Sequence, residues 1–161
     1  MHSTTASTIR ASTSTARAVT DLRVTFRWLR RPGGRHTGPL RDLATGVLRR
    51  LGVGTAEVGV LVCDDATIRS LNRQFRGKDR PTDVLSFPLD NPQPEGSRYL
   101  GDVAISLETA ARQAAEAGTS VATELKTLVL HGMVHLCGYD HETDGGEMKR
   151  LEGRLRRELI R

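Results

Sequence analysis

The sequence of 161 residues is 37% hydrophobic and 27% charged, which favours a soluble globular domain over a disordered or fibrous chain. It has no apolar run near the roughly 20 residues of a membrane-spanning helix, and its two cysteines, Cys63 and Cys137, are too few for a disulfide framework. The net charge of +5 is unevenly spread. Residues 1–50 hold ten arginines against two aspartates, which leaves 14 basic and 17 acidic residues in the remainder. The overall charge is therefore weak evidence for nucleic-acid binding, and no membrane partner is expected.

The first 20 residues differ in composition from the rest of the chain. They are mostly Ser, Thr, Ala and Arg, and no acidic residue precedes Asp21. Because such a segment buries too little apolar surface to fold alone, we predict a disordered extension over residues 1–20 and one folded domain over residues 21–161. The composition also resembles an organellar transit peptide, which is the less favoured alternative.

The folded part begins with a strand, a helix and a second strand. Residues 22–28 alternate apolar and polar side chains, the period of a strand with one buried face. Apolar residues then recur at helical spacing over residues 40–51, and Gly52 can end that helix. Residues 57–63 predict a largely buried strand.

A basic helix follows this second strand. Asp64 or Asp65 can cap its first turn, and Gly77 can end it. Its expected apolar stripe consists of Ile68, Leu71 and Phe75. Its basic residues lie beside or beyond that stripe and should be accessible: Arg69, Arg73, Arg76, Lys78 and Arg80. Such a cluster can bind phosphate, but it is equally typical of a solvated helix face.

The second half contains a hairpin and three helices. Residues 84–87 and 99–105 predict two strands joined by a loop rich in proline and glycine. Ser106 and Ser120 can each cap a helix, the second of which should end at Gly138. A final amphipathic helix carries its apolar residues at spacings of three and four: Met148, Leu151, Leu155 and Leu159. Four strands and about five helices predict a single α+β domain with a mixed sheet, and no dinucleotide cofactor is expected.

Three of the five histidines in the chain fall within eleven residues. His131 and His135 are four residues apart, so a helix places them on one face at a spacing that suits a metal ion. Gly138 permits a sharp turn that can bring His141 back toward them. Three imidazoles with an open fourth position are typical of catalytic zinc, so we predict one Zn²⁺ per chain. Asp140 is a candidate acceptor for a ligand histidine or a simple turn residue.

One absence limits the mechanism. In H-E-x-x-H peptidases the residue after the first histidine is a glutamate that acts as general base, and here it is Gly132. An ordinary zinc peptidase is therefore disfavoured. Glu124, two helical turns before His131, Asp102 and Asp140 are weak candidates for the base. Cys137 should point away from His135, so we do not count it as a ligand.

Two motifs together resemble the YbeY family of metal-dependent endoribonucleases. One runs from His131 to His141, the other is Arg-Gly-Lys-Asp-Arg-Pro-Thr-Asp-Val-Leu-Ser-Phe over residues 76–87, and the likeness extends over about residues 21–160. It implies a zincin-like fold, zinc bound by the three histidines, and a functionally important arginine at Arg76. It also implies a cytoplasmic enzyme that cleaves single-stranded RNA in 16S rRNA 3′-end maturation and ribosome quality control.

With that resemblance, Arg76 is the candidate catalytic residue, and its planar guanidinium suits a phosphate. Arg73, Lys78 and Arg80 become candidates for RNA binding, with the small ribosomal subunit as partner. The simpler alternative is that Arg76 is a cation at a helix C-terminus, where positive charge is mildly favourable. Two alternative functions also remain: a ribosome-assembly factor whose metal is mainly structural, and a metal-dependent hydrolase of another substrate.

Overall fold

The computed structural model describes residues 20–29, 34–92 and 98–161, so all of the expected N-terminal extension except Thr20 lies outside the described residues. Within the described part, no helix is long and apolar enough to cross a membrane. The elements in chain order are β1 Leu22–Trp28, α1 Gly34–Arg50, β2 Ala56–Cys63, α2 Asp65–Arg76, β3 Val84–Pro92, β4 Arg98–Ser106, α3 Leu107–Ala117, α4 Val121–Leu136 and α5 Glu147–Leu159. The predicted α+β domain is confirmed.

The four strands form one mixed sheet in the order β1-β2-β4-β3. β1 pairs with β2 and β2 with β4 in parallel, whereas β3 is antiparallel to β4. The last two strands are the expected hairpin. β3 is consequently an edge strand, a position that matters for the site described below.

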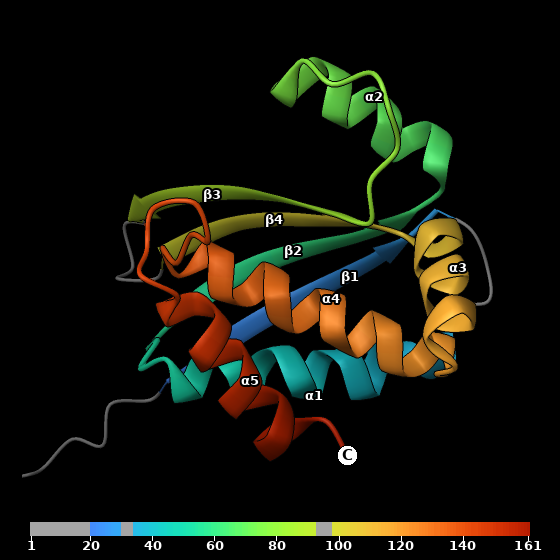
Figure 1. Ribbon diagram of the computed structural model, residues 1–161. Coiled ribbons are helices and arrows are strands. Elements are labelled where there is room, and N and C mark those ends of the chain that lie inside the picture. Colours follow the sequence, from blue (N-terminus) through green and yellow to red (C-terminus); the bar gives the residue numbers. More distant parts are fainter. Residues whose placement is uncertain (1–19, 30–33, 93–97) are drawn as a thin grey trace, which may run out of the picture.

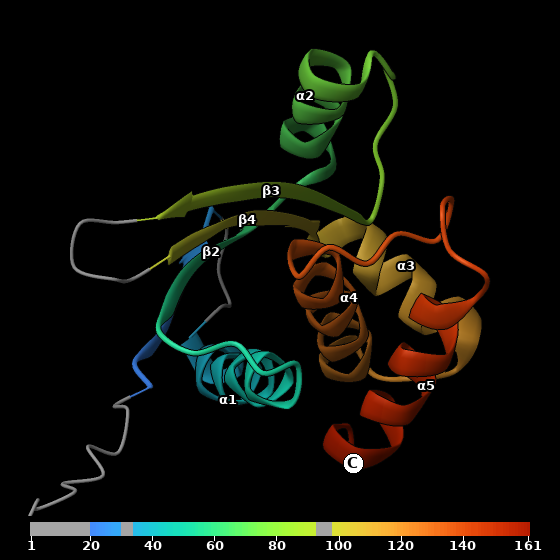
Figure 2. The same cartoon turned by 90° about the vertical axis from the view of Figure 1, so that its left-hand side faces the viewer.

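The two faces of the sheet are covered very differently (Figure 1). Helices α1, α4 and α5 lie on one side, with α3 at one end, and α2 lies alone on the other side (Figure 2). The larger hydrophobic core joins the first set of helices to the sheet. A smaller cluster of buried residues lies under α2: Cys63, Ile68, Leu85 and Ala104.

Two element boundaries differ from the prediction. Helix α1 begins at Gly34, six residues before the expected start, and includes Pro39. Pro39 lies past the first turn, so it removes one intrahelical N–H donor, and Trp28 Nε1 holds this first part by donating to Thr37 Oγ1 at 2.9 Å. Strand β3 continues through Pro92 because proline is compatible with an edge strand.

Helix α2 confirms its predicted caps but not all of its predicted stripe. Asp64 accepts a hydrogen bond from Thr67 N at 2.9 Å, and Gly77 ends the helix with φ +68°. Ile68 is fully buried, but Phe75 is 57% exposed. The apolar stripe is therefore buried only in part, and the Phe75 ring packs edge to face on Phe87 of the edge strand.

Candidate functional site

The three predicted metal ligands converge at the end of helix α4. The ring centroids of His131 and His135 are 4.6 Å apart, and His141 lies 5.2 Å from the first and 5.8 Å from the second. One ligand atom from each residue lies within 4.8 Å of the other two. Imidazole nitrogens are preferred zinc ligands, so this donor set fits a zinc ion.

The position of α4 against the sheet explains why a glycine follows the first histidine. Ser120 caps the helix by accepting from Thr123 N at 3.1 Å. Gly132 is buried against β4, where an added Cβ would lie 2.7 Å from Val103 Cγ1. A glutamate side chain at this position would force Val103 or the helix to shift. The general base of an H-E-x-x-H peptidase is therefore excluded by packing.

The turn after α4 brings the third histidine into place. Gly138 has φ +93°, a left-handed conformation that favours glycine, and its N–H donates to His135 O at 3.0 Å. Asp140 Oδ1 accepts from Glu142 N at 3.0 Å, so this carboxylate shapes the loop. It contributes to the position of His141.

Glu152 on α5 completes the cluster and was missed by the sequence analysis. Its Oε1 lies 2.5 Å from His131 Nδ1, and its Oε2 lies 3.7 Å from His141 Nε2. The first contact leaves Nε2 of His131 free to face a metal. Helical periodicity could have indicated that Glu152 turns toward the core, because it follows Met148 by four residues and so lies beside the apolar face of α5.

The local electrostatics favour neutral imidazole at the centre of the cluster. Burial, and then the nearby charges of His131 and His141, lower the pKa of His135. Burial raises the pKa of the Glu152 carboxyl, but the hydrogen bond with His131 and the neighbouring histidines hold it below its ordinary value overall. A neutral imidazole is the form that binds a metal ion, so the lowered pKa of His135 favours metal binding at this residue.

Arg76 reaches the same cavity from the opposite face of the sheet. The cavity has a volume of about 450 Å³, and its walls include Arg76, Ser86, His131, His135 and Asp140. Arg76 Nη2 donates to Ser86 O at 3.1 Å. Asp83 O accepts from Ser106 N, so by the alternation of an antiparallel ladder the backbone of Ser86 faces away from β4, toward the free edge. Arg76 can therefore cross this edge from α2.

The remaining basic candidates lie on the surface around α2 and outside the walls of the cavity. Arg73, Lys78 and Arg80 are exposed. Arg69 instead pairs with Asp79, through Nε and Oδ1 at 2.9 Å and Nη2 and Oδ2 at 3.1 Å. This pairing neutralises part of the basic cluster.

The candidate bases occupy three different places. Asp140 lines the histidine cavity. Glu124 lines a neighbouring cavity of about 290 Å³ that also borders His131 and Glu152, and burial followed by the charge of Asp83 raises the pKa of Glu124. Asp102 lines a groove on the α2 face of the sheet. The structure does not bring Asp102 together with the histidines.

The two cysteines are separate from this cluster. Cys63 is buried and Cys137 is partly buried, and both are free thiols. Burial raises the pKa of each thiol to about 11. Neither has the low pKa of a reactive cysteine, and Cys137 is not part of the histidine cluster.

Comparison with known proteins identifies the family. Residues 40–159 match the model of the family described as "Endoribonuclease YbeY". The chain is 49% identical over 120 residues to "Endoribonuclease YbeY" of Anaeromyxobacter sp. (strain Fw109-5), covering 73% of this chain and 62% of that protein. It is 52% identical over 104 residues to the protein of the same name from Aquifex aeolicus (strain VF5), covering 65% and 69%.

A solved structure supports the same assignment. The solution structure of a Thermotoga maritima protein is similar with a TM-score of 0.58 and 30% sequence identity, over 86% of this chain and 88% of that one. The matched region of the first relative is less than two thirds of its length. From the family match and these identities, the chain belongs to the endoribonuclease YbeY family.

Proposed function

We propose that this protein is a zinc-dependent endoribonuclease that cleaves single-stranded RNA. Its cellular role in this proposal is 16S rRNA 3′-end maturation and ribosome quality control in the cytoplasm, at the small ribosomal subunit. The observation that carries the proposal is the convergence of three histidines and Arg76 on one cavity, although they come from opposite faces of the sheet. The curated relatives named as endoribonucleases support the choice of RNA.

The histidines and Arg76 have different roles in phosphodiester hydrolysis. His131, His135 and His141 would hold the zinc ion, which when bound supplies a Lewis acid and makes water a competent nucleophile near neutral pH. Arg76 binds the phosphate. Its contact with Ser86 O uses one N–H of a guanidinium group that carries five, so a planar pair of donors is left for two phosphate oxygens. Stabilising negative charge on those oxygens lowers the barrier to bond cleavage.

Among the candidate bases, Asp140 is the one that lines this cavity. One of its oxygens accepts from Glu142 N, and the second can orient the attacking water or take its proton. Glu124 lines a different cavity that also borders His131, and Asp102 lines the groove on the α2 face of the sheet. We therefore assign the proton-accepting role to Asp140. Arg73, Lys78 and Arg80 are placed to attract the RNA backbone.

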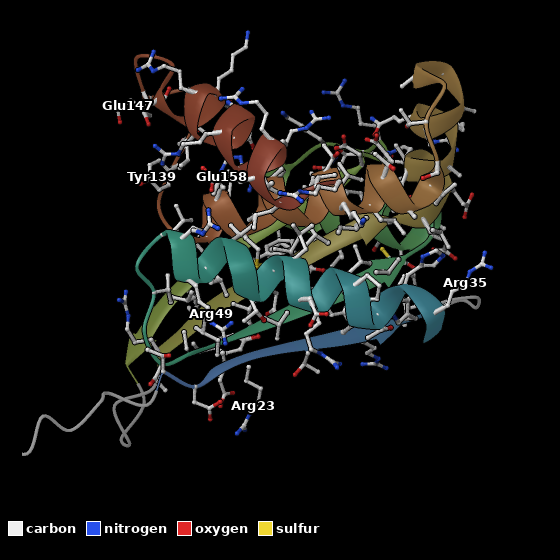
Figure 3. The ribbon with its side chains drawn as sticks, turned by 90° about the horizontal axis from the view of Figure 1, so that it is seen from below. Arg23, Arg35, Arg49, Tyr139, Glu147 and Glu158 are labelled. Carbon is white, nitrogen blue, oxygen red and sulfur yellow. The ribbon has the colours of Figure 1, made fainter. Side chains whose placement is uncertain are left out.

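The test is cleavage of a single-stranded RNA by the purified protein with and without a chelator, together with its zinc content. His135→Ala should lose both metal and activity, whereas Arg76→Ala should keep the metal and lose most activity. Arg35→Ala, which changes an exposed arginine on α1 (Figure 3), is the matched control and should behave as the unchanged protein. Cleavage that persists in chelator and in both site variants would indicate a contaminating nuclease.

An assembly factor with a structural metal is the second candidate. It is favoured by the contacts of Glu152, through which the histidine cluster joins α4, the loop after it and α5. In that case metal removal should lower the thermal unfolding midpoint, and RNA binding should survive without any cleavage. Activity on a non-RNA phosphodiester with none on RNA would favour the third candidate, another hydrolase.

A further inference from the structure

Helix α2 covers only part of its face of the sheet (Figure 2). A second cavity lies on that face. It is a groove of about 490 Å³, and its apolar walls come from α2 and three strands: Leu61, Leu71, Phe75, Phe87 and Ala104. Phe75 is 57% exposed, and its ring meets Phe87 edge to face with centroids 5.1 Å apart. This groove therefore presents an accessible aromatic surface.

The groove and the histidine cavity are on the two sides of one contact between α2 and β3. Phe75 and Arg76 are successive on the helix, and Ser86 and Phe87 are successive on the strand. Arg76 donates to Ser86 O on the cavity side, while Phe75 packs on Phe87 on the groove side. A molecule held by Arg76 thus lies next to the groove.

We propose that the groove is a nucleobase subsite, in which a base of single-stranded RNA stacks on Phe75 while the adjoining phosphate is held by Arg76. This inference rests on the proposed function. Stacking of bases on aromatic side chains beside a basic surface is a general mode of single-strand binding. The groove is not wholly apolar, because Thr25 and Arg27 of β1 also line it at the far edge of the sheet.

Charge favours a nucleic acid over an apolar protein segment at this position. Arg27 lines the groove itself, and Arg73 and Lys78 are exposed on α2 and just after it, so this side of the sheet carries cations that attract a polyanion. Asp102 is the opposing charge, and its Oδ1 already accepts from Tyr99 OH at 2.5 Å. That hydrogen bond holds the Asp102 carboxylate against Tyr99, which lies on the same strand.

The experiment first maps the bond that the zinc-loaded protein cleaves in a short RNA. It then compares that RNA with a matched RNA that carries abasic nucleotides on both sides of the bond. KM, kcat and the binding affinity are measured for Phe75→Ala, Phe75→Leu and Phe75→Trp. Leu89→Ala is the control, since Leu89 is 52% exposed on the same strand as Phe87 and lines neither cavity. Thermal unfolding verifies that each variant folds.

We expect Phe75→Ala to raise KM for the intact RNA by about fivefold to a hundredfold, the range for loss of one stacked base, with kcat nearly unchanged. Phe75→Leu should behave like Phe75→Ala, Phe75→Trp should restore binding, and all should be equal on the abasic RNA. Equal KM and affinity for Phe75→Ala and the unchanged protein on intact RNA would overturn the subsite and leave the groove to a protein partner. If the unchanged protein cleaves no RNA, the proposed function fails, and the affinities still decide the subsite.

Discussion

Replacing Glu152 by glutamine removes a negative charge beside two of the three imidazoles but keeps the shape of the side chain. The glutamine oxygen can still accept from His131 Nδ1, so Glu152→Gln isolates the charge, whereas Glu152→Ala also removes the hydrogen bond. The side chain is only 17% exposed, so solvent replaces it poorly. Loss of such an outer partner typically weakens metal binding by about 10- to 100-fold, or roughly 1.4 to 2.8 kcal/mol. We expect Glu152→Gln near the lower limit and Glu152→Ala near the upper one.

The assay is competition for zinc between the protein and a chromogenic chelator at fixed pH. Glu147→Gln is the control because Glu147 is an exposed carboxylate at the start of the same helix (Figure 3). It removes the same charge from α5 without touching a histidine. Equal zinc affinity in Glu152→Gln, Glu152→Ala and Glu147→Gln would refute the assignment of Glu152 as a positioning residue, provided that all three unfold at a similar temperature.

Three further predictions concern packing, pH and salt. Gly132→Ala should destabilise the protein by about 1 to 3 kcal/mol, because the new Cβ lies 2.7 Å from Val103. Gly153→Ala on α5 has room for a Cβ and should stabilise the protein by up to about 1 kcal/mol. Urea unfolding measures both changes, and a Gly132→Ala variant more stable than the unchanged protein would contradict the close packing of α4. Folding raises the pKa of Glu124, so the folded state binds its proton more tightly and loses stability as pH rises through that range. Glu124→Gln should therefore raise the thermal unfolding midpoint at neutral pH, with a gain that shrinks toward pH 4, and a gain independent of pH would exclude this cause. Arg73, Lys78 and Arg80 are each replaced by alanine to test phosphate contacts. Loss of one contact should reduce the magnitude of the slope of log RNA affinity against log salt concentration by about 0.7, and an unchanged slope would show that the residue does not contact the RNA.

Local signals in the sequence were sufficient for most elements of the fold. Ser106 and Ser120 cap helices as expected, because a capping hydroxyl acts within three residues of its own position. The histidine cluster was predictable for a similar reason, since a helical turn and a glycine turn determine it locally. The start of α1 and the end of β3 were not predictable, because they depend on tertiary structure: the hydrogen bond from Trp28 to α1 and the position of β3 at the edge of the sheet.

The parts of the site that could not be predicted depend on contacts across the fold. Glu152 approaches His131 only because α5 packs beside α4, and a charged residue next to an apolar stripe is usually read as exposed. The resemblance pointed to Arg76, but nothing in its spacing indicates that it crosses the sheet edge to Ser86 O. The exposure of Phe75 likewise reflects how α2 lies on the sheet, whereas helical periodicity alone predicts only that it belongs to the apolar stripe.

The edge position of β3 has a consequence for the behaviour of the protein at high concentration. An edge strand presents unpaired backbone groups that can recruit another strand and start aggregation. Here side chains occupy such groups, since Asp83 Oδ1 accepts from Val84 N at 2.7 Å and Arg76 donates to Ser86 O. The arginine that binds the phosphate in our proposal thus also occupies a backbone acceptor at the free edge of the strand, which protects the protein from self-association whether or not RNA is bound.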